Sequence, residues 1–352
     1  MCLDKAKVER KVIVVAAYNE APFIIPCMKA VIETAKKIDA EIIISINLST
    51  DTTPDLVKEF FISNAYQKLT VLYQEIYLEA TEHHVRLMKH VISGGVKGHM
   101  IWCGADDILE PDFHVTALRL LTINKQETTD LITVFGDNRQ IDKNGEVIQI
   151  ISMRRNWYGI QGWRAMQKIS KAKYPNLNGT WVPIIVYEKY INLIERHWAE
   201  RVVIHRANDR YVWMLAASQT TFLYITEGFA VNYRIHFDKP WIRSMKEAEL
   251  SNLRFIEWII RECPKIDEYD HMNVIKMTAK KHLLSILCNS FRPNYCLPED
   301  VYSTAERVGS PLLFKIVALT FKKFPSIAPK ISLKIASSLR SVKKNIKSLI
   351  KN

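Results

Sequence analysis

The first 140 residues alternate short apolar runs with amphipathic segments, and this alternation restricts the chain to few folds. Uninterrupted β-branched or apolar runs predict buried strands, and apolar residues at helical spacing predict helices. The predicted strands cover residues 12–17, 41–46, 69–73 and 99–103. Helices are predicted between and after them, at 22–37, 82–92 and 111–121, and a further helix with Pro54 in its first turn is predicted to end at Ser63. Buried strands that alternate with helices are typical of an α/β domain with a mainly parallel sheet flanked by helices.

Further along, the pattern changes. Two strand-like runs flank residues 142–145, whose Asp-Lys-Asn-Gly sequence favours a hairpin turn. A helix is predicted at 208–217, and beyond residue 243 the chain is predicted to be helical. We therefore expect a catalytic-type domain over 1–245, with halves at about 1–140 and 141–245. A helical extension over 246–310 and a basic amphipathic tail over 311–352 are expected to follow it.

Polar residues directly follow three of the predicted strands, at 18–20, 47–51 and 104–107. Ligands of such sheets bind where the carboxyl ends of the strands meet. Asp106 and Asp107 are the most informative residues there, because adjacent carboxylates after a buried strand are costly unless a cation or hydrogen bonds neutralise them. Oxygen ligands of this kind suit Mg²⁺ or Mn²⁺ holding a diphosphate. A second interpretation, in which Asp106 only caps the following helix, stays open at this point.

Five ordered motifs accompany this acidic pair: AYNEA at 17–21, STDTT at 49–53, DDILEPD at 106–112, NDRYVWML at 208–215 and YRIH at 233–236. Their order and spacing over residues 10–240 resemble family 2 glycosyltransferases of the GT-A fold, of the bacterial surface-polysaccharide type. The resemblance implies a GT-A-like fold, a nucleotide-sugar donor and a divalent cation, Mn²⁺ or Mg²⁺, as cofactor.

The resemblance also implies a role for individual residues. Asp209 matches the general base that removes a proton from the acceptor hydroxyl during an inverting displacement. The implied metal ligands are Asp107, Asp106 and His236. The implied donor-binding residues are Tyr18, Glu20, Asn47, Asp51, Asp106 and Arg234. Trp157 and Trp163 are candidate acceptor-binding residues, because flat aromatic faces suit sugar C–H surfaces.

Alternatives accompany several of these assignments. His236 at a strand end is equally compatible with an ordinary structural histidine, and each tryptophan is compatible with hydrophobic packing. Trp213 is expected to pack in the core. The sequence also departs from the family at two positions, with Asn47 in a loop where an aspartate is usual and Asn208 where an acid usually precedes the base. A UDP-sugar is the favoured donor, although the loss of the aspartate weakens the inference of uridine specificity.

The net charge of +12 is concentrated at the C-terminus. Residues 308–352 contain ten Lys or Arg and no acid, whereas the remaining residues carry 39 basic and 37 acidic side chains. Apolar residues recur at helical spacing over 331–350, which is typical of a helix lying on an anionic membrane surface. A helix docked on the domain, with solvated lysines, is the alternative. Nucleic acid is not an expected partner, because no aromatic residues are interleaved with the charges of residues 325–352.

No uncharged apolar run of 18 residues, apolar leader or metal-finger cysteine spacing occurs in the sequence. We therefore expect a cytoplasmic protein, or one peripheral at the inner face of the cell membrane. The predicted function is metal-dependent transfer of a sugar from a nucleoside diphosphate to a glycan or lipid-linked acceptor. The alternatives are a sugar nucleotidyltransferase and a non-catalytic protein that binds nucleotide sugars or the membrane surface.

Overall fold

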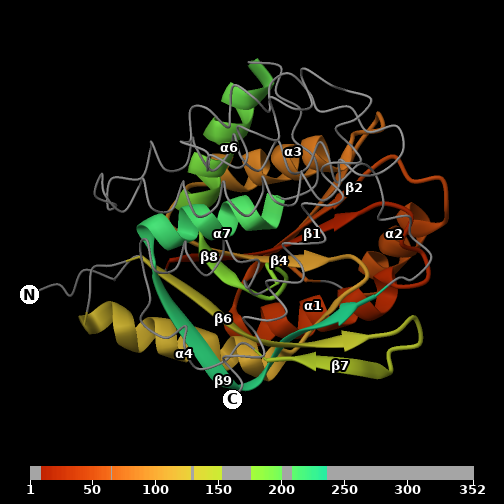
Figure 1. Cartoon of the computed structure of the whole chain (residues 1–352). Helices are drawn as coiled ribbons and strands as arrows, with labels where there is room; N and C mark the ends of the chain where they lie inside the picture. The colour runs from red at the N-terminus through yellow and green to blue at the C-terminus, as the bar shows by residue number, and fades with distance from the viewer. Residues whose placement is uncertain (1–8, 65, 128–130, 153–175, 200–207, 236–352) are drawn as a thin grey trace, which may run out of the picture. The chain divides into compact units, whose positions relative to one another are not determined.

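A computed structural model describes residues 9–64, 66–127, 131–152, 176–199 and 208–235 of the chain (Figure 1). These described residues all fall within one compact unit. They confirm the predicted α/β architecture of a sheet with helices on both of its faces.

The strands of the described residues form one sheet in the order β3-β2-β1-β4-β8-β6-β9-β5, and β7 pairs with β6. Strands β1 to β4 are mutually parallel, as are β6 and β9, whereas β8 is antiparallel to both β4 and β6. The short β5 is antiparallel to β9, and β7 forms the predicted hairpin with β6. The strand bounds are β1 Arg10–Ala17, β2 Glu41–Ile46, β3 Leu69–Tyr73, β4 Gly98–Gly104, β5 Ile108–Leu109, β6 Ile132–Ile141, β7 Val147–Ile151, β8 Trp181–Pro183 and β9 Thr221–Arg234.

Helices cover both faces of the sheet. In Figure 1, α1, α2 and α4 lie on one side of it, and α3, α6 and α7 lie on the other. The helix bounds are α1 Ile24–Ile38, α2 Thr53–Ser63, α3 Ala80–Ser93, α4 Pro111–Glu127, α6 Ile184–Ala199 and α7 Asn208–Gln219. The middle strand β1 lies beneath both layers, and Val12, Ile13, Val14 and Val15 are completely buried. A strand covered on both faces needs apolar residues in succession, which explains the unbroken run in the sequence.

The predicted elements of the first 121 residues are confirmed with small shifts at their ends. The helix expected from Pro22 begins at Ile24, after a turn in which the carbonyl of Glu20 accepts hydrogen bonds from the N–H groups of Phe23 and Ile24. Trp213 is fully buried against Phe135 and Phe222, as expected for a core residue.

Three strands, β5, β8 and β9, and the helix α6 were not predicted, and β5 has only two residues. β8 contains only three residues, too few for a periodic signal, and β9 runs for 14 residues with register shifts where it pairs with β6. The helices predicted beyond residue 243 and the basic tail lie outside the described residues. Within the described part of the chain, none of the helices has the length and apolar character needed to cross a bilayer.

Candidate active site

The carboxyl ends of β1, β2 and β4 meet at one edge of the sheet, as the parallel pairing requires. The acidic pair lies in the turn that follows β4, where the N–H of Asp107 donates to the carbonyl of Gly104 at 3.0 Å. Asp107 is completely buried, whereas Asp106 is half-buried. The two neighbouring acids therefore meet different surroundings.

Two donors fix the carboxylate of Asp107. Its Oδ1 accepts the backbone N–H of Arg234 at 2.8 Å, and its Oδ2 accepts a hydrogen bond from Nδ2 of Asn178. Burial raises the pKa of Asp107 well above its usual range, and the neighbouring charge of Asp106 raises it further. The hydrogen bonds from Arg234 and Asn178 lower the pKa but do not offset the burial. A cation bound nearby would favour the ionised form of Asp107.

Gly104 marks the point on which the two carboxylates converge. A Cβ atom at this glycine would lie 2.7 Å from Oδ2 of Asp107 and 2.8 Å from Oδ1 of Asp106, closer than real contacts allow. The missing side chain thus leaves a small space between two carboxylate oxygens. This donor set fits a hard divalent cation, which takes oxygen ligands and completes its shell with water and substrate phosphates.

The described residues supply only part of a metal site. They contain no group of three or more His, Cys, Asp and Glu side chains that could hold a metal ion. The predicted third ligand, His236, lies outside the described residues. The pair of carboxylates is therefore the part of the predicted site that the structure describes.

Two buried thiols lie beneath the same turn. The Sγ atoms of Cys27 on α1 and Cys103 on β4 are 3.9 Å apart, and each is 3.4 Å from the carbonyl oxygen of Gly104. Both cysteines are free. They act as weak donors to the backbone at the base of the acidic turn.

The loops after β1 and β2 are tied together by side-chain hydrogen bonds. Asn19 adopts a left-handed conformation, with φ of 54°, and its Oδ1 accepts the N–H of Thr50 at 2.8 Å. Asp51 accepts the N–H groups of Ala21 and Thr53, both at 3.0 Å. Burial raises the pKa of Asp51, but its hydrogen bonds to Thr53 and Ala21 outweigh burial and lower the pKa overall. Asp51 therefore holds the two loops in register.

Asn47 is also engaged by the protein. Its Nδ2 donates to the carbonyl of Leu78 at 2.8 Å, and its Oδ1 accepts the N–H groups of Leu78 and Leu48, both at 3.0 Å. The side chain is 3% exposed. The amide that the sequence suggests for the nucleobase thus fastens the loop after β2 to the loop before α3.

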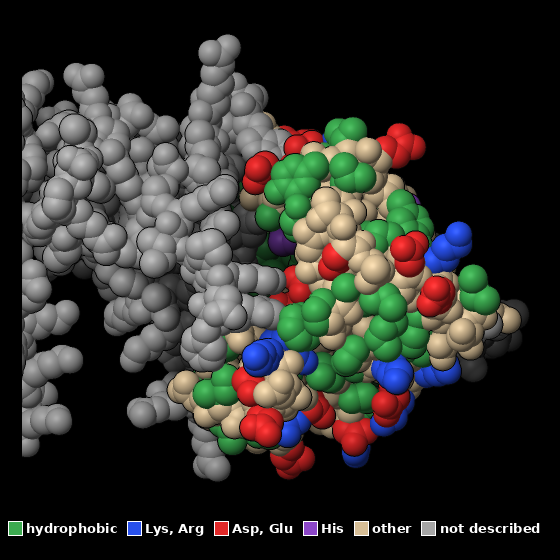
Figure 2. Space-filling model, turned by 90° about the vertical axis from the view of Figure 1, so that its right-hand side faces the viewer, with side chains coloured by type: hydrophobic (Ala, Val, Ile, Leu, Met, Phe, Trp, Pro, Cys, Tyr) green, Lys and Arg blue, Asp and Glu red, His purple; other side chains and the backbone are tan. Residues whose placement is uncertain are grey.

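An aromatic pair is exposed at this edge. The ring centroids of Tyr18 and Tyr77 lie 5.3 Å apart, and the two residues are 40% and 50% exposed. Leu48 and Ile76, in the same two loops as Asn47 and Tyr77, are also exposed. Figure 2 shows one face of the molecule, on which hydrophobic side chains lie exposed among acidic and basic ones. Exposed rings of this kind offer a stacking surface to a planar ligand.

The structure thus brings most of the described candidates to one edge. Tyr18, Glu20, Asn47 and Asp51 lie in the loops after β1 and β2, and Asp106 and Asp107 lie after β4. Arg234, the last residue of β9, contacts the turn that contains the acidic pair. Asp209 is the second residue of α7, but its side chain lies outside the described residues. Trp157 and Trp163 lie outside them as well.

Sequence reasoning missed Asn178, Asn19 and Tyr77. Asn178 belongs to no periodic sequence pattern, and only the fold brings it next to Asp107, 71 positions away. An Asn before a helix is a known signal for a left-handed turn, so Asn19 could have been recognised. Tyr77 carries no periodic signal in its loop.

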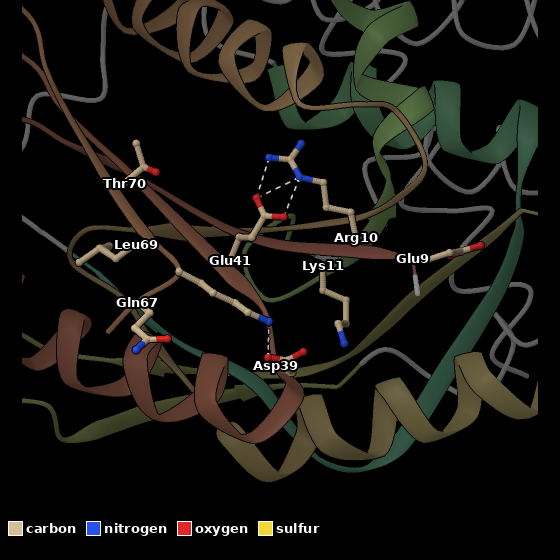
Figure 3. Close-up of a pocket in the computed structure, with 9 residues that line it drawn as sticks. Glu9, Arg10, Lys11, Asp39, Glu41, Gln67, Leu69 and Thr70 are labelled. Atoms are coloured by element: carbon tan, nitrogen blue, oxygen red, sulfur yellow. Dashed lines mark hydrogen bonds and ion pairs between the residues drawn. The ribbon is translucent and has the colours of Figure 1, made fainter. Parts of the chain in front are cut away.

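A separate cavity of about 510 Å³ lies at the opposite edge, where β1, β2 and β3 begin (Figure 3). Its charges are largely paired, with Arg10 bonded to Glu41 and Lys68 bonded to Asp39. Burial lowers the pKa of Lys11, which also lines the cavity. None of the predicted site residues lies there, so we assign the candidate site to the carboxyl edge.

Comparison with known families supports this placement. Residues 12–165 match the model of glycosyl transferase family 2, a range that includes the loops after β1 and β2 and the acidic turn. These residues form a family 2 glycosyltransferase domain. The chain is accordingly an enzyme of the glycosyltransferase class. The family 2 match ends before the motifs at 208–215 and 233–236, whose assignment rests on the resemblance alone.

Solved structures have a fold similar to that of this chain. TarS residues 1–349 from S. aureus, solved in complex with UDP-GlcNAc, has a TM-score of 0.59 at 13% identity, covering 96% of this chain and 92% of that chain. The same part of TarS in complex with UDP has a TM-score of 0.59 at 12% identity, covering 94% and 91%. At these identities the similarity concerns the fold. No curated protein sequence matches the chain.

Proposed function

We propose that this family 2 glycosyltransferase transfers a sugar from a nucleoside diphosphate donor, with a UDP-sugar favoured, to a hydroxyl of a glycan or lipid-linked acceptor. The observation that carries the proposal is the convergence of the Asp106 and Asp107 carboxylates over Gly104, at the edge where the strands of the sheet end. TarS, which shares the fold, has been solved with UDP-GlcNAc and with UDP. A bacterial surface-polysaccharide pathway is the setting we propose.

The contacts suggest a division of labour within the acidic pair. Asp107 is buried and held by Arg234 and Asn178, so we propose that it fixes the turn and supplies at most one oxygen to a cation. Asp106 is half-buried, so we propose that its carboxylate is the main protein ligand of the cation. A Mn²⁺ or Mg²⁺ ion held here, with His236 as a further proposed ligand, would neutralise the charge of the departing diphosphate.

The remaining roles follow the chemistry of an inverting displacement. Asp209 accepts the proton of the acceptor hydroxyl as that oxygen attacks the anomeric carbon, and the bond from this carbon to the diphosphate oxygen breaks. Tyr18 and Tyr77 offer a stacking surface to the nucleobase of the donor. Asn47 and Asp51 shape the pocket by holding its loops. Trp157 and Trp163 remain the proposed acceptor platform.

Two substitutions test the proposal. Nucleotide sugars are screened with and without Mn²⁺ by thermal shift, and turnover of the stabilising donor is then measured. Asp106→Ala should abolish Mn²⁺-dependent donor binding, whereas Asp209→Asn should bind donor like the parent and lose transfer by a factor of about 10² or more. Parental donor binding and parental transfer in both variants would refute the site.

A further inference from the structure

Arg234 joins several segments at the candidate site. Its backbone N–H donates to Oδ1 of Asp107 at 2.8 Å, and its Nε donates to the carbonyl oxygen of Asp106 at 2.9 Å. Its Nη1 donates to the carbonyl oxygen of Asp142, in the turn between β6 and β7. The guanidinium carbon lies 4.6 Å from the ring centre of Phe23, just before α1. Arg234 therefore contacts the acidic turn, the hairpin and the loop after β1 at once.

These contacts account for the orientation of the side chain. Arg234 is only 5% exposed, and its Nε and Nη1 each donate to a backbone carbonyl. These two bonds fix the orientation of the planar guanidinium, and its low exposure leaves little of it open to a phosphate. The contacts favour an internal brace, a side chain that holds neighbouring segments together, over an anion-binding residue.

The Arg234 side chain also contributes a positive charge near the acidic pair. The guanidinium is hydrogen-bonded to the backbone of Asp106, so a permanent positive charge lies beside the two converging carboxylates. A buried pair of like charges is costly without such compensation. Arg234 thus contributes both the position of the acidic turn and part of the charge balance that keeps it in place.

We propose that Arg234 is a positioning residue that sets the cation affinity of the Asp106–Asp107 pair and does not contact the donor phosphates. This inference rests on the proposed function, and it replaces the phosphate contact that the sequence suggested for this arginine. Lysine keeps the positive charge, but its single amino group does not reproduce the planar arrangement that donates to both carbonyls. It also lacks the flat face that stacks on Phe23. Arg234→Lys should therefore separate charge from geometry.

The test compares Arg234→Lys with a matched control, Arg139→Lys. Arg139 also lies on a strand of the sheet, donates to Glu110 and stacks 4.6 Å from the ring centre of Phe229, and its described contacts do not include Asp106 or Asp107. For each full-length variant, donor turnover is titrated with Mn²⁺, the donor KM is measured at saturating Mn²⁺, and Mn²⁺ binding is measured directly by calorimetry.

We expect Arg234→Lys to raise the half-saturating Mn²⁺ concentration roughly tenfold, the size expected for one charge-assisted contact. Donor KM at saturating Mn²⁺ should stay within roughly threefold of the parent, and kcat should recover. Arg139→Lys should behave like the parent. Phe23→Leu, a milder change that removes the ring and keeps the hydrogen bonds, should shift Mn²⁺ dependence in the same direction and so covers the case in which Arg234→Lys does not fold.

Other outcomes overturn the inference. A large rise in donor KM at saturating Mn²⁺, with unchanged Mn²⁺ affinity, would make Arg234 a phosphate contact. A lower melting temperature with unchanged Mn²⁺ affinity would make it a structural residue only. If the parent shows no Mn²⁺-dependent turnover, the proposed function itself fails, whereas a normal parent with an insensitive Arg234→Lys contradicts this inference alone.

Discussion

At the scale of single residues, the adjacent acids Asp106 and Asp107 differ in their surroundings. Asp107 is buried and accepts two hydrogen bonds from distant parts of the chain, whereas Asp106 is half-buried beside it. The sequence located this pair correctly, because two acids after a buried strand are conspicuous. It did not predict which acid is buried, because the partners Asn178 and Arg234 come from the other half of the sheet.

The space at Gly104 leads to a first prediction. Gly104→Ala places a methyl group where the Asp106 and Asp107 oxygens lie 2.8 and 2.7 Å away, so the carboxylates must separate. We expect Mn²⁺ affinity to fall by about tenfold or more, since cation ligands tolerate displacements of only a few tenths of an ångström. Mn²⁺ titration of donor turnover checks this, with circular dichroism to verify the fold. An unchanged titration curve would show that the cation does not sit between these oxygens.

For Asn47 and Asp51, too, the sequence located the residues but did not predict their contacts. Both were predicted to bind donor, and the structure shows each making two or more hydrogen bonds to backbone groups. Whether a polar loop residue faces a ligand or a neighbouring loop depends on backbone geometry that a sequence pattern does not contain. Their proposed roles accordingly move from contact to support.

At the scale of elements, the loops after β1 and β2 behave as one unit, and this yields a second prediction. Asp51→Ala removes the acceptor of the Ala21 and Thr53 N–H groups. The loss should lower the free energy of unfolding by about 1–2 kcal/mol. Urea unfolding measures this loss. The exposed Asp55, in the first turn of α2, provides the control, since Asp55→Ala should cost about 0.5 kcal/mol or less. Equal effects of the two changes would contradict the loop-tying role.

Most elements of the parallel half were predictable because their strands are buried on both faces and their helices have one apolar face. β8 and β9 were not. β8 is too short for a pattern, and β9 has four buried residues in succession followed by three exposed ones, so it lacks a regular alternation. Their pairing with β6 depends on contacts between segments far apart in sequence, which only the folded chain reveals.

At the scale of the whole molecule, the surplus of positive charge in the tail predicts salt-sensitive membrane binding. The full chain should bind phosphatidylserine-containing vesicles and release them at high salt. Replacing three tail lysines with glutamine should weaken binding roughly a hundredfold, at about 1 kcal/mol per cation. The substituted positions are Lys343, Lys344 and Lys347.

The control replaces three exposed lysines of the domain: Lys29, Lys58 and Lys97. Vesicle co-sedimentation measures both triple variants. Equal binding of the two, or binding to neutral phosphatidylcholine vesicles alone, would favour a tail that docks on the protein.

Buried histidines make the whole fold sensitive to acid. Burial lowers the pKa of His83 and His99 to about 4 and that of His114 to about 3, from an ordinary value of 6.5. The folded chain keeps them neutral, while the unfolded chain takes up protons below pH 6.5. Their stabilising contribution is therefore complete above pH 6.5 and is lost as the pH falls towards 4 and then 3.

Thermal unfolding between pH 7.5 and 4.5 tests this prediction. Each buried histidine should contribute about 1.4 kcal/mol per pH unit within its window. His83→Gln should reduce the pH dependence by about that amount, whereas His90→Gln, at an exposed position, should leave it unchanged. Identical slopes in the parent and His83→Gln would contradict the assignment.

One residue of β8 links the two parts of the sheet. Trp181 pairs with Ile101 of β4 and with Val134 of β6, and its Nε1 donates to His114 at 3.0 Å. The acidic turn follows β4, while its partner Arg234 ends β9, which belongs with β6. A strand only three residues long therefore joins the parts of the sheet that hold the acidic turn and Arg234. We expect that a change that loosens β8 would separate the acidic pair from Arg234 and lower the proposed activity before the domain unfolds.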